Sequence, residues 1–182
     1  MMKKIVITGV SSGIGFSAAK ILCDSGYLVY GSVRTEPDAQ KVKDHFGENF
    51  TPLIFDVTDA KGIQENAQFV KNELNPGEVL SGLVNNAGVA MGGPVSLIDT
   101  DVFRKQFEVN FFGLIEVTKT FLPMLGAVKN STLQGKIINI SSVSGRNANP
   151  FVAPYCASKF AVEGFSDALR RELLIYGVDV IL

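Results

Sequence analysis

Histidine and cysteine are scarce in this sequence of 182 residues, which contains one histidine and two cysteines. Cys23 and Cys156 lie far apart and outside any CxxC pattern, so we expect no disulfide scaffold, no zinc ribbon and no other metal site. His45 lies in the polar stretch 43–47, and we interpret it as an exposed residue near a helix end. A Ser-His-Asp triad would have to use this single histidine, so the composition argues against that class of enzyme.

A charge excess of either sign and long hydrophobic runs are also absent. Lysine and arginine number 17 against 18 aspartates and glutamates, which gives a net charge of −1. The chain therefore has no excess of basic residues that could bind a phosphate backbone, and we expect no nucleic-acid partner. No apolar run approaches the ~20 residues of a membrane span, and the apolar stretch after the N-terminal lysines stops at Thr8, too early for a secretory signal. The sequence predicts a reduced, cytoplasmic protein without membrane contact.

Short apolar runs alternate with longer helical stretches along the whole chain, and no linker rich in proline, glycine or serine divides it. This alternation is typical of βαβ units, and the continuous apolar character of the runs suits a parallel sheet covered on both faces. We therefore predict one α/β domain over residues 1–182 with a doubly wound parallel sheet. The predicted strands are 5–7, 27–33, 52–55, 80–85, 136–140 and 178–182, and the predicted helices are 14–25, 38–46, 59–74, 153–176 and a long helix from Asp99 or Asp101 toward Leu125.

A glycine-rich loop, Thr8-Gly9-Val10-Ser11-Ser12-Gly13-Ile14-Gly15, follows the first predicted strand and opens the first helix. Glycine lets a backbone approach a pyrophosphate closely, and a helix N-terminus favours phosphate. The spacing is Gly-x3-Gly-x-Gly and differs from the general GxGxxG fingerprint. A tight turn with close helix–strand packing is the alternative interpretation. The strand before the loop and the helix after it favour a dinucleotide site.

This loop resembles the TGxxxGxG motif of the short-chain dehydrogenase/reductase family, and three further segments fit that family in the same order. Asn85-Asn86-Ala87-Gly88 resembles its NNAG motif, Asp56-Val57 stands at its adenine-contacting position, and Tyr155-Cys156-Ala157-Ser158-Lys159 matches its YxxxK motif. The resemblance spans the whole chain. It implies a Rossmann-type oxidoreductase that transfers a hydride between the nicotinamide of NAD or NADP and a small-molecule carbonyl or alcohol substrate.

The resemblance also implies a set of cofactor-binding residues. For two of its motifs the residues themselves leave an alternative open. Asn85 and Asn86 could serve merely to tie loops together, and this is the more natural interpretation for Asn85 than for Asn86. Asp56 could be a plain turn or cap residue. The implied cofactor-binding set is Gly9, Ser11, Ser12, Gly13, Ile14, Gly15, Arg34, Asp56, Val57, Asn86, Ala87 and Gly88, together with Tyr155 and Lys159.

The end of the second strand bears on the choice between NAD and NADP. An acid there would bind the ribose 2′-hydroxyl, whereas an arginine suits a 2′-phosphate. The family's acid position falls at Val33, which cannot accept a hydrogen bond, and Arg34 follows with a planar fork of donors. We therefore predict NADP. Glu36 keeps NAD possible, and a plain surface charge is the alternative role of Arg34.

Tyr155 and Lys159 are four residues apart at a predicted helix start, so they share one helix face. Opposite unit charges ~4 Å apart at an effective dielectric of ~20 attract by roughly 4 kcal/mol, so an ammonium makes a phenol usable as a general acid/base. The resemblance assigns that role to Tyr155 and implies that Lys159 also holds the nicotinamide ribose.

Two more catalytic residues follow from the same resemblance. Ser142, thirteen residues before Tyr155, would bind the substrate oxygen, although Ser141 and Ser144 are neighbours that composition does not exclude. Asn110 would hold a water in a proton relay to the lysine. Asparagine is unfavourable inside a helix, and the alternative is a solvent-facing or helix-capping Asn110.

Family members usually continue beyond the sixth strand with a Pro-Gly turn, a substrate loop and a seventh strand, whereas this sequence stops at Leu182. We expect a chain truncated after its sixth strand, in which adenosine binding survives better than catalysis. A non-catalytic dinucleotide-binding module or an inactive truncated enzyme is therefore the alternative. A methyltransferase on the same fold is disfavoured by NNAG together with YxxxK. The resemblance further implies a homo-oligomer, a dimer or tetramer, formed through helices near 101–125 and 154–176.

Overall fold

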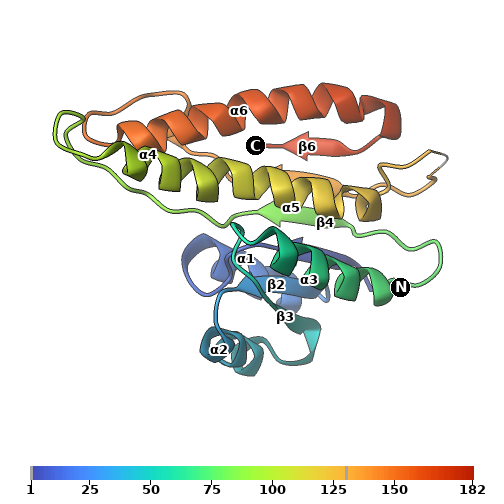
Figure 1. Ribbon diagram of the computed structural model, residues 1–182. Coiled ribbons are helices and arrows are strands. Elements are labelled where there is room, and N and C mark those ends of the chain that lie inside the picture. Colours follow the sequence, from blue (N-terminus) through green and yellow to red (C-terminus); the bar gives the residue numbers. More distant parts are fainter. Residues whose placement is uncertain (1, 130) are drawn as a thin grey trace.

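Six parallel strands form one sheet in the order β3-β2-β1-β4-β5-β6 in the computed structural model (Figure 1), which describes residues 2–129 and 131–182. Every neighbouring pair is parallel, so each connection between strands must cross over the sheet. This order confirms the prediction of a doubly wound α/β fold. The strands are β1 (Lys4–Ile7), β2 (Leu28–Val33), β3 (Phe50–Ile54), β4 (Gly82–Asn85), β5 (Lys136–Asn139) and β6 (Asp179–Ile181).

Six α-helices connect the strands, and local sequence explains where several begin. Thr35, Asp59 and Asp99 each accept a hydrogen bond from a backbone N–H of the first turn that they cap. Because Thr35 is the cap, the second helix begins at Glu36, two residues earlier than predicted. Pro37 is compatible with the first turn of this helix. The helices are α1 (Gly13–Asp24), α2 (Glu36–Phe46), α3 (Ala60–Asn72), α4 (Thr100–Phe107), α5 (Gly113–Phe121) and α6 (Ala153–Leu173).

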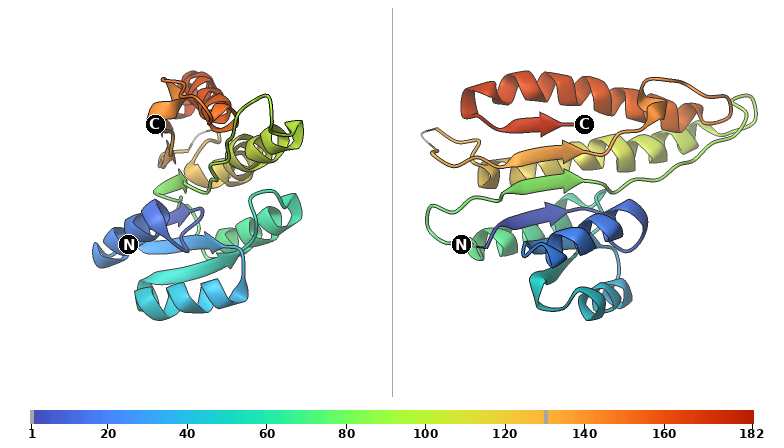
Figure 2. Two further views of the ribbon diagram at one scale, coloured as in Figure 1. Left: turned by 90° about the vertical axis from the view of Figure 1, so that its left-hand side faces the viewer. Right: turned by 180° about the vertical axis from the view of Figure 1, so that it is seen from behind.

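The helices cover the sheet from two sides and bury two separate cores (Figure 2). On one side, Ala19 and Cys23 of α1 and Ala39 and Val42 of α2 pack with β1 and β2. On the other side, buried residues of α3, α5 and α6 pack against the same sheet, with Phe121 fully buried among them. Apolar burial stabilises by roughly 25 cal/mol per Å², so both faces contribute to the fold.

The long helix predicted from Asp99 toward Leu125 is interrupted. Its course runs through α4, then a π-helical segment over Glu108–Phe112, then α5, and ends in a 3-10 turn over Leu122–Leu125. The cap is Asp99, not Asp101. Asn110 stands in the middle of the π segment and is 2% exposed, so it is neither solvent-facing nor capping. Single π turns inside helices are frequent at functional sites.

The third strand was predicted too late in the sequence, because it spans Phe50–Ile54 and not 52–55. Pro52 lies inside β3, which is possible because β3 pairs only with β2 and leaves its other edge open. Asp56 and Val57 follow the strand end, with Phe55 between Asp56 and β3.

The scarce residues lie as expected. Cys23 and Cys156 are both free and buried, in agreement with the expected lack of a disulfide. His45 is exposed in the last turn of α2, where its ring lies 4.8 Å from that of Phe16. In the described part of the chain, the helices are either too short or too polar to cross a membrane.

Two helical glycines give opposite predictions for the same substitution. A methyl group added at Gly164 in α6 meets nothing within 4 Å, so Gly164→Ala should raise the free energy of unfolding by about 0.5–1 kcal/mol through helix propensity. At Gly113 the added carbon would lie 2.8 Å from the backbone oxygen of Val57, so Gly113→Ala should lower it by about 1–3 kcal/mol. Urea denaturation of both variants measures the difference, and equal shifts of the same sign would contradict the packing described.

Candidate active site

The glycine loop after β1 adopts a conformation that side chains would disturb. Gly9 and Gly13 have φ angles of 73° and 62°, in the left-handed region that favours glycine. A Cβ at Gly9 would lie 2.9 Å from Ala87 Cα, and one at Gly15 would overlap Gly9 O and the Asn86 amide. The glycines therefore serve a close approach between the loops after β1 and β4, and not only a tight turn.

Four hydrogen bonds join these two loops. The Thr8 hydroxyl oxygen accepts from the backbone N–H groups of Asn86 and Ala87, both at 3.0 Å. In return, the Asn86 side chain donates to the carbonyl oxygens of Thr8 and Gly9, both at 2.9 Å. The Asn86 amide hydrogens are thus engaged in tying loops together, the role that the sequence had suggested more strongly for Asn85.

The backbone N–H groups at the start of α1 are not capped by the side chain of the N-cap residue. Ser12 is the N-cap residue, but its hydroxyl makes no capping hydrogen bond, and the first turn carries no acidic residue. The first N–H groups of a helix have no partner within the helix and attract anions. The start of α1 is therefore suited to a phosphate.

A cleft of about 370 Å³ opens beside this turn, at the carboxyl ends of the strands. It brings together most of the predicted cofactor-binding residues from four separate segments. Asp56 lines it although one of its carboxylate oxygens accepts from the backbone and hydroxyl of Thr58, so Asp56 is also the turn residue of the alternative interpretation. The lining residues that were predicted are Gly9, Ser11, Ser12, Ile14, Arg34, Asp56, Val57, Asn86, Ala87 and Gly88.

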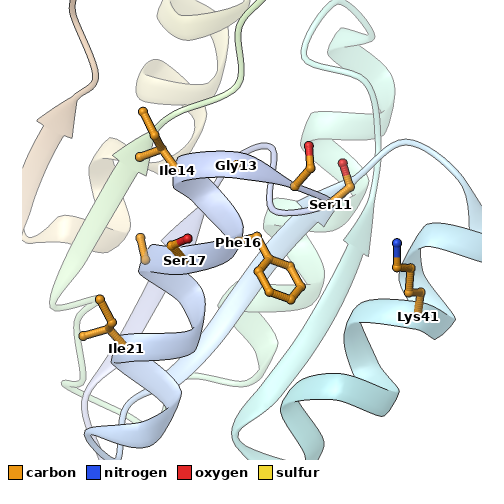
Figure 3. A pocket seen from close by; sticks show the side chains of 9 residues that line it. Ser11, Gly13, Ile14, Phe16, Ser17, Ile21 and Lys41 are labelled. Carbon is orange, nitrogen blue, oxygen red and sulfur yellow. The ribbon is translucent and has the colours of Figure 1, made fainter.

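A larger depression of about 780 Å³ lies on the outer side of α1 and shares Ser11, Ser12 and Ile14 with the cleft (Figure 3). Its wall is mainly apolar, with Ile21 and Phe16 on α1 and Lys41 on the facing helix α2. The polar residues from the strand ends converge on the smaller cleft and not on this depression. We therefore place the candidate site in the cleft.

Tyr155 and Lys159 lie in the first turns of α6, as predicted. The Lys159 ammonium lies 5.8 Å from the centre of the Tyr155 ring and donates to the carbonyl oxygen of Ile140 at 2.7 Å. Lys159 is 7% exposed, and this burial lowers the pKa of its amine below the usual value because water no longer solvates the charge. A positive charge is thus held close to a half-buried phenol.

Ser142 is brought to the same helix by the turn that follows β5. Its hydroxyl accepts from the backbone of Ser144 at 3.1 Å and caps the 3-10 turn Val143–Gly145. A Cβ at Gly145 would lie 3.1 Å from Lys159 O, so this turn packs directly on α6. The Ser141 hydroxyl is buried without a partner among the described residues, and it faces Gly145. Ser142, Tyr155 and Lys159 do not line the cleft itself.

Asn110 connects the cleft to the Tyr155 helix. Its side-chain oxygen accepts from the backbone of Val89 at 2.9 Å, and its amide donates to Val89 O and to the Ser158 hydroxyl, at 2.9 and 3.1 Å. Both amide hydrogens are engaged, so a relay water at Asn110 would have to bind one of its oxygen atoms. Gln106, one turn earlier on the same helix, was not predicted to matter, yet it is fully buried against the same loop.

Comparison with known proteins gives a consistent result. A sequence model of the family described as short chain dehydrogenase matches residues 3–182. The chain is 42% identical over 181 residues to the NADPH-dependent 3-dehydrocapnine reductase of Ornithobacterium rhinotracheale, covering 100% of this chain and 64% of that protein. It is 41% identical over 179 residues to human dehydrogenase/reductase SDR family member 9, covering 98% and 54% respectively. The chain therefore spans only about half to two thirds of these relatives.

Solved structures agree with the sequence relatives. A short-chain dehydrogenase from Streptomyces avermitilis superimposes with a TM-score of 0.88 at 28% identity, over 99% of this chain and 64% of that one. An actinorhodin polyketide ketoreductase variant with NADPH gives a TM-score of 0.88 at 30% identity, over 97% and 67%. A short chain dehydrogenase from Burkholderia cenocepacia in complex with NADP gives 0.85 at 29% identity, over 99% and 70%.

The buried ammonium of Lys159 predicts a pH dependence of stability. The unfolded chain keeps this proton up to the usual pKa of 10.5, whereas the folded chain releases it earlier. Between the two pKa values the unfolded state binds more protons, so the free energy of unfolding rises with pH, by at most ~1.4 kcal/mol per pH unit. The unfolding free energy of the unaltered chain minus that of Lys159→Met should therefore increase toward pH 10.5. A difference that stays flat or falls over this range would show that Lys159 is not desolvated.

Proposed function

Because the chain belongs to the short-chain dehydrogenase family, we propose that it binds a nicotinamide dinucleotide and interconverts a carbonyl compound and its alcohol. The observation that carries this proposal is the position of one buried ammonium, Lys159, 5.8 Å from the centre of the Tyr155 ring. Both residues lie on α6, which Asn110 ties to the cleft through Ser158. Oxidoreductases among the relatives support it.

The residues present fit a dinucleotide. The loops after β1 and β4 approach each other closely at the base of the cleft, and the uncapped first turn of α1 lies beside the cleft with free N–H groups. We propose that Gly13, Ile14 and Gly15 hold the pyrophosphate, and that Asp56 and Val57 contact the adenine. Ala87 and Gly88 would form the opposite wall. When bound, the nicotinamide supplies or accepts the hydride.

NADP is the proposed cofactor, with NAD as the alternative. The Val33 side chain offers no acceptor for a ribose hydroxyl, while Arg34 is exposed at the cleft and forms no ion pair within residues 2–129 and 131–182. Lys41 adds a second cation at the adjoining depression (Figure 3). The names of an NADPH-dependent relative and of structures with NADP and NADPH support this preference.

In the proposed reduction, Tyr155 donates its phenolic proton to the carbonyl oxygen while the carbonyl carbon receives the hydride, which gives an alcohol and a phenolate. Lys159 stabilises that phenolate through its nearby charge and holds the nicotinamide ribose. Ser142 donates its hydroxyl hydrogen to the same substrate oxygen, because its own oxygen already accepts from Ser144. Asn110 would support return of the proton through a water held by one of its oxygen atoms.

A non-catalytic dinucleotide-binding module is the second candidate. It is favoured by the position of Ser142, Tyr155 and Lys159 outside the lining of the cleft. The single-domain organisation over residues 1–182, the homo-oligomer through the helices near 101–125 and 154–176, and a cytoplasmic location remain predictions. Exposed Phe112 and Phe160 on those helices are compatible with the oligomer.

Replacing the proposed general acid should separate binding from chemistry. Tyr155→Phe removes one hydroxyl from a half-buried ring, so we expect an unchanged far-ultraviolet spectrum and NADPH affinity within about threefold. The rate of carbonyl reduction should fall by about 10²–10⁴-fold, the usual contribution of a positioned acid. Tyr176→Phe, at the other end of the same helical segment, is the control. Undiminished turnover in Tyr155→Phe would remove Tyr155 from the mechanism.

The role proposed for Arg34 at the 2′-phosphate can be tested by removing its charge. Loss of a charge-assisted hydrogen bond to phosphate costs ~1.5–3 kcal/mol, so Arg34→Ala should weaken NADPH binding by roughly 10–100-fold and leave NADH binding within about twofold. Calorimetric titration with both nucleotides measures this, with exposed Arg171→Ala in the last turn of α6 as the matched control. Equal weakening for NADH, or none for NADPH, would refute the assignment of Arg34 to the 2′-phosphate.

A further inference from the structure

Gln106 on α4 has a fully buried side-chain amide, and within residues 2–129 and 131–182 its side-chain hydrogen bonds go to one loop. Its side-chain oxygen accepts from the backbone N–H of Met91 at 2.8 Å, and its amide donates to Val89 O at 2.6 Å. A buried glutamine is uncommon unless its polar atoms are satisfied, and here each of the two groups has a partner. The hydrogen bonds to the loop thus explain why the Gln106 side chain can be buried, which apolar packing alone would not.

Asn110 holds the same loop one helical turn later. It pairs with both the N–H and the carbonyl oxygen of Val89, each at 2.9 Å. Two side-chain amides on one helix face therefore hydrogen-bond to the backbone over 89–91 much as a neighbouring strand would. Buried backbone groups need such partners. Val89 also lines the cleft, so this clamp fixes part of the cleft wall.

The far side of the loop touches the segment that leads into α6. Gly93 donates its backbone N–H to Phe151 O at 2.6 Å, and a Cβ at Gly92 would overlap the same oxygen. Phe151 has a φ angle of 66°, the only positive value at a non-glycine position within residues 2–129 and 131–182. Such strain persists only where surrounding structure imposes it, and it often marks a functional site. Tyr155 follows four residues later, in the first turn of α6.

The loop 89–93 thus lies between α4 and the beginning of α6, whose starting ends lie near one another in Figure 1. We propose that Gln106 is a positioning residue: it locks this loop as a brace that sets the start of α6, and with it the Tyr155 phenol, relative to the cleft. Gln106 does not touch substrate or cofactor. This inference rests on the proposed function, in which the placement of Tyr155 governs proton transfer, and misplacement by about 1 Å can cost 10²-fold in rate.

Amide hydrogen exchange on the 182-residue chain tests the brace without any need for activity. Gln106→Met keeps the side-chain length but removes both hydrogen bonds, so exchange at Met91, Gly93 and Cys156 should accelerate at least about 10-fold through local opening. Ile63→Ala, which removes a fully buried side chain in α3, is the control for general destabilisation and should leave these three amides unaffected relative to the rest of the chain. Gly92→Ala pushes the loop from the Phe151 side and should have the same local effect as Gln106→Met.

Kinetics supply a readout that a purely structural role would not move. For Gln106→Met and Gly92→Ala we expect kcat to fall at least about 10-fold while KM for NADPH stays within threefold, since the adenosine end of the cleft is untouched. Gln106→Glu restores one donor and one acceptor only when its carboxyl is protonated. Its activity relative to the unaltered chain should therefore rise as pH is lowered, whereas that of Gln106→Met should not.

Each outcome decides one question. Unchanged exchange at Met91, Gly93 and Cys156 in both Gln106→Met and Gly92→Ala would overturn the brace, whatever the activity. A variant Gln106→Glu whose relative activity is independent of pH would do the same. If Gln106→Met does not fold, Gly92→Ala and Gln106→Glu carry the test. Failure of the unaltered chain to bind NADPH or reduce any carbonyl would overturn the proposed function, while the exchange result would still support or overturn the brace.

Discussion

The pairing of the loops after β1 and β4 is the constraint on which the rest of the site depends. In a doubly wound sheet these two central strands send their chains to opposite faces, which opens a crevice at their carboxyl ends. Thr8 and Asn86 close the base of that crevice with four hydrogen bonds. The missing side chains of Gly9 and Gly15 allow the approach. A cleft of defined width, with free helix N–H groups at one side, is the consequence.

A second set of polar contacts carries this frame toward Tyr155 and Lys159. Asn110 joins the backbone of Val89 to the Ser158 hydroxyl, and the turn at Gly145 packs on the backbone of Lys159. The hydrogen bond to Ser158 is buried, where an unpartnered polar group costs about 1–3 kcal/mol, so it favours one arrangement. The desolvated ammonium of Lys159 is the exception, since its burial is unfavourable. Its hydrogen bond to Ile140 O keeps the charge in place beside the phenol.

Much of the fold followed from the sequence because its signals are local. The alternation of apolar runs and helical stretches predicted six parallel strands, and Asp59 marked the start of α3 correctly through its capping chemistry. The glycine-rich loop was likewise expected to lead into the first helix, and α1 begins at Gly13, one residue before the predicted start at Ile14. Such features depend on a few neighbouring residues, so a single sequence reports them.

Other features depend on contacts that no local pattern contains. The π segment around Asn110 is set by tertiary hydrogen bonds to Val89 and Ser158, so the sequence predicted an unbroken helix there. Asn86 was predicted mainly to bind a cofactor, yet its amide ties the loop after β4 to the loop after β1, a contact across 78 positions of the sequence. Gln106 gave one usable signal: it lies four residues before Asn110, so the two amides share one helix face.

The most direct test of this account is a crystal structure of the 182-residue chain with NADPH. The account predicts the diphosphate over the first turn of α1, the adenosine between Arg34 and Asp56, and the nicotinamide directed toward Tyr155. A nucleotide bound instead in the depression on the outer side of α1, or no nucleotide at saturating concentration, would contradict it.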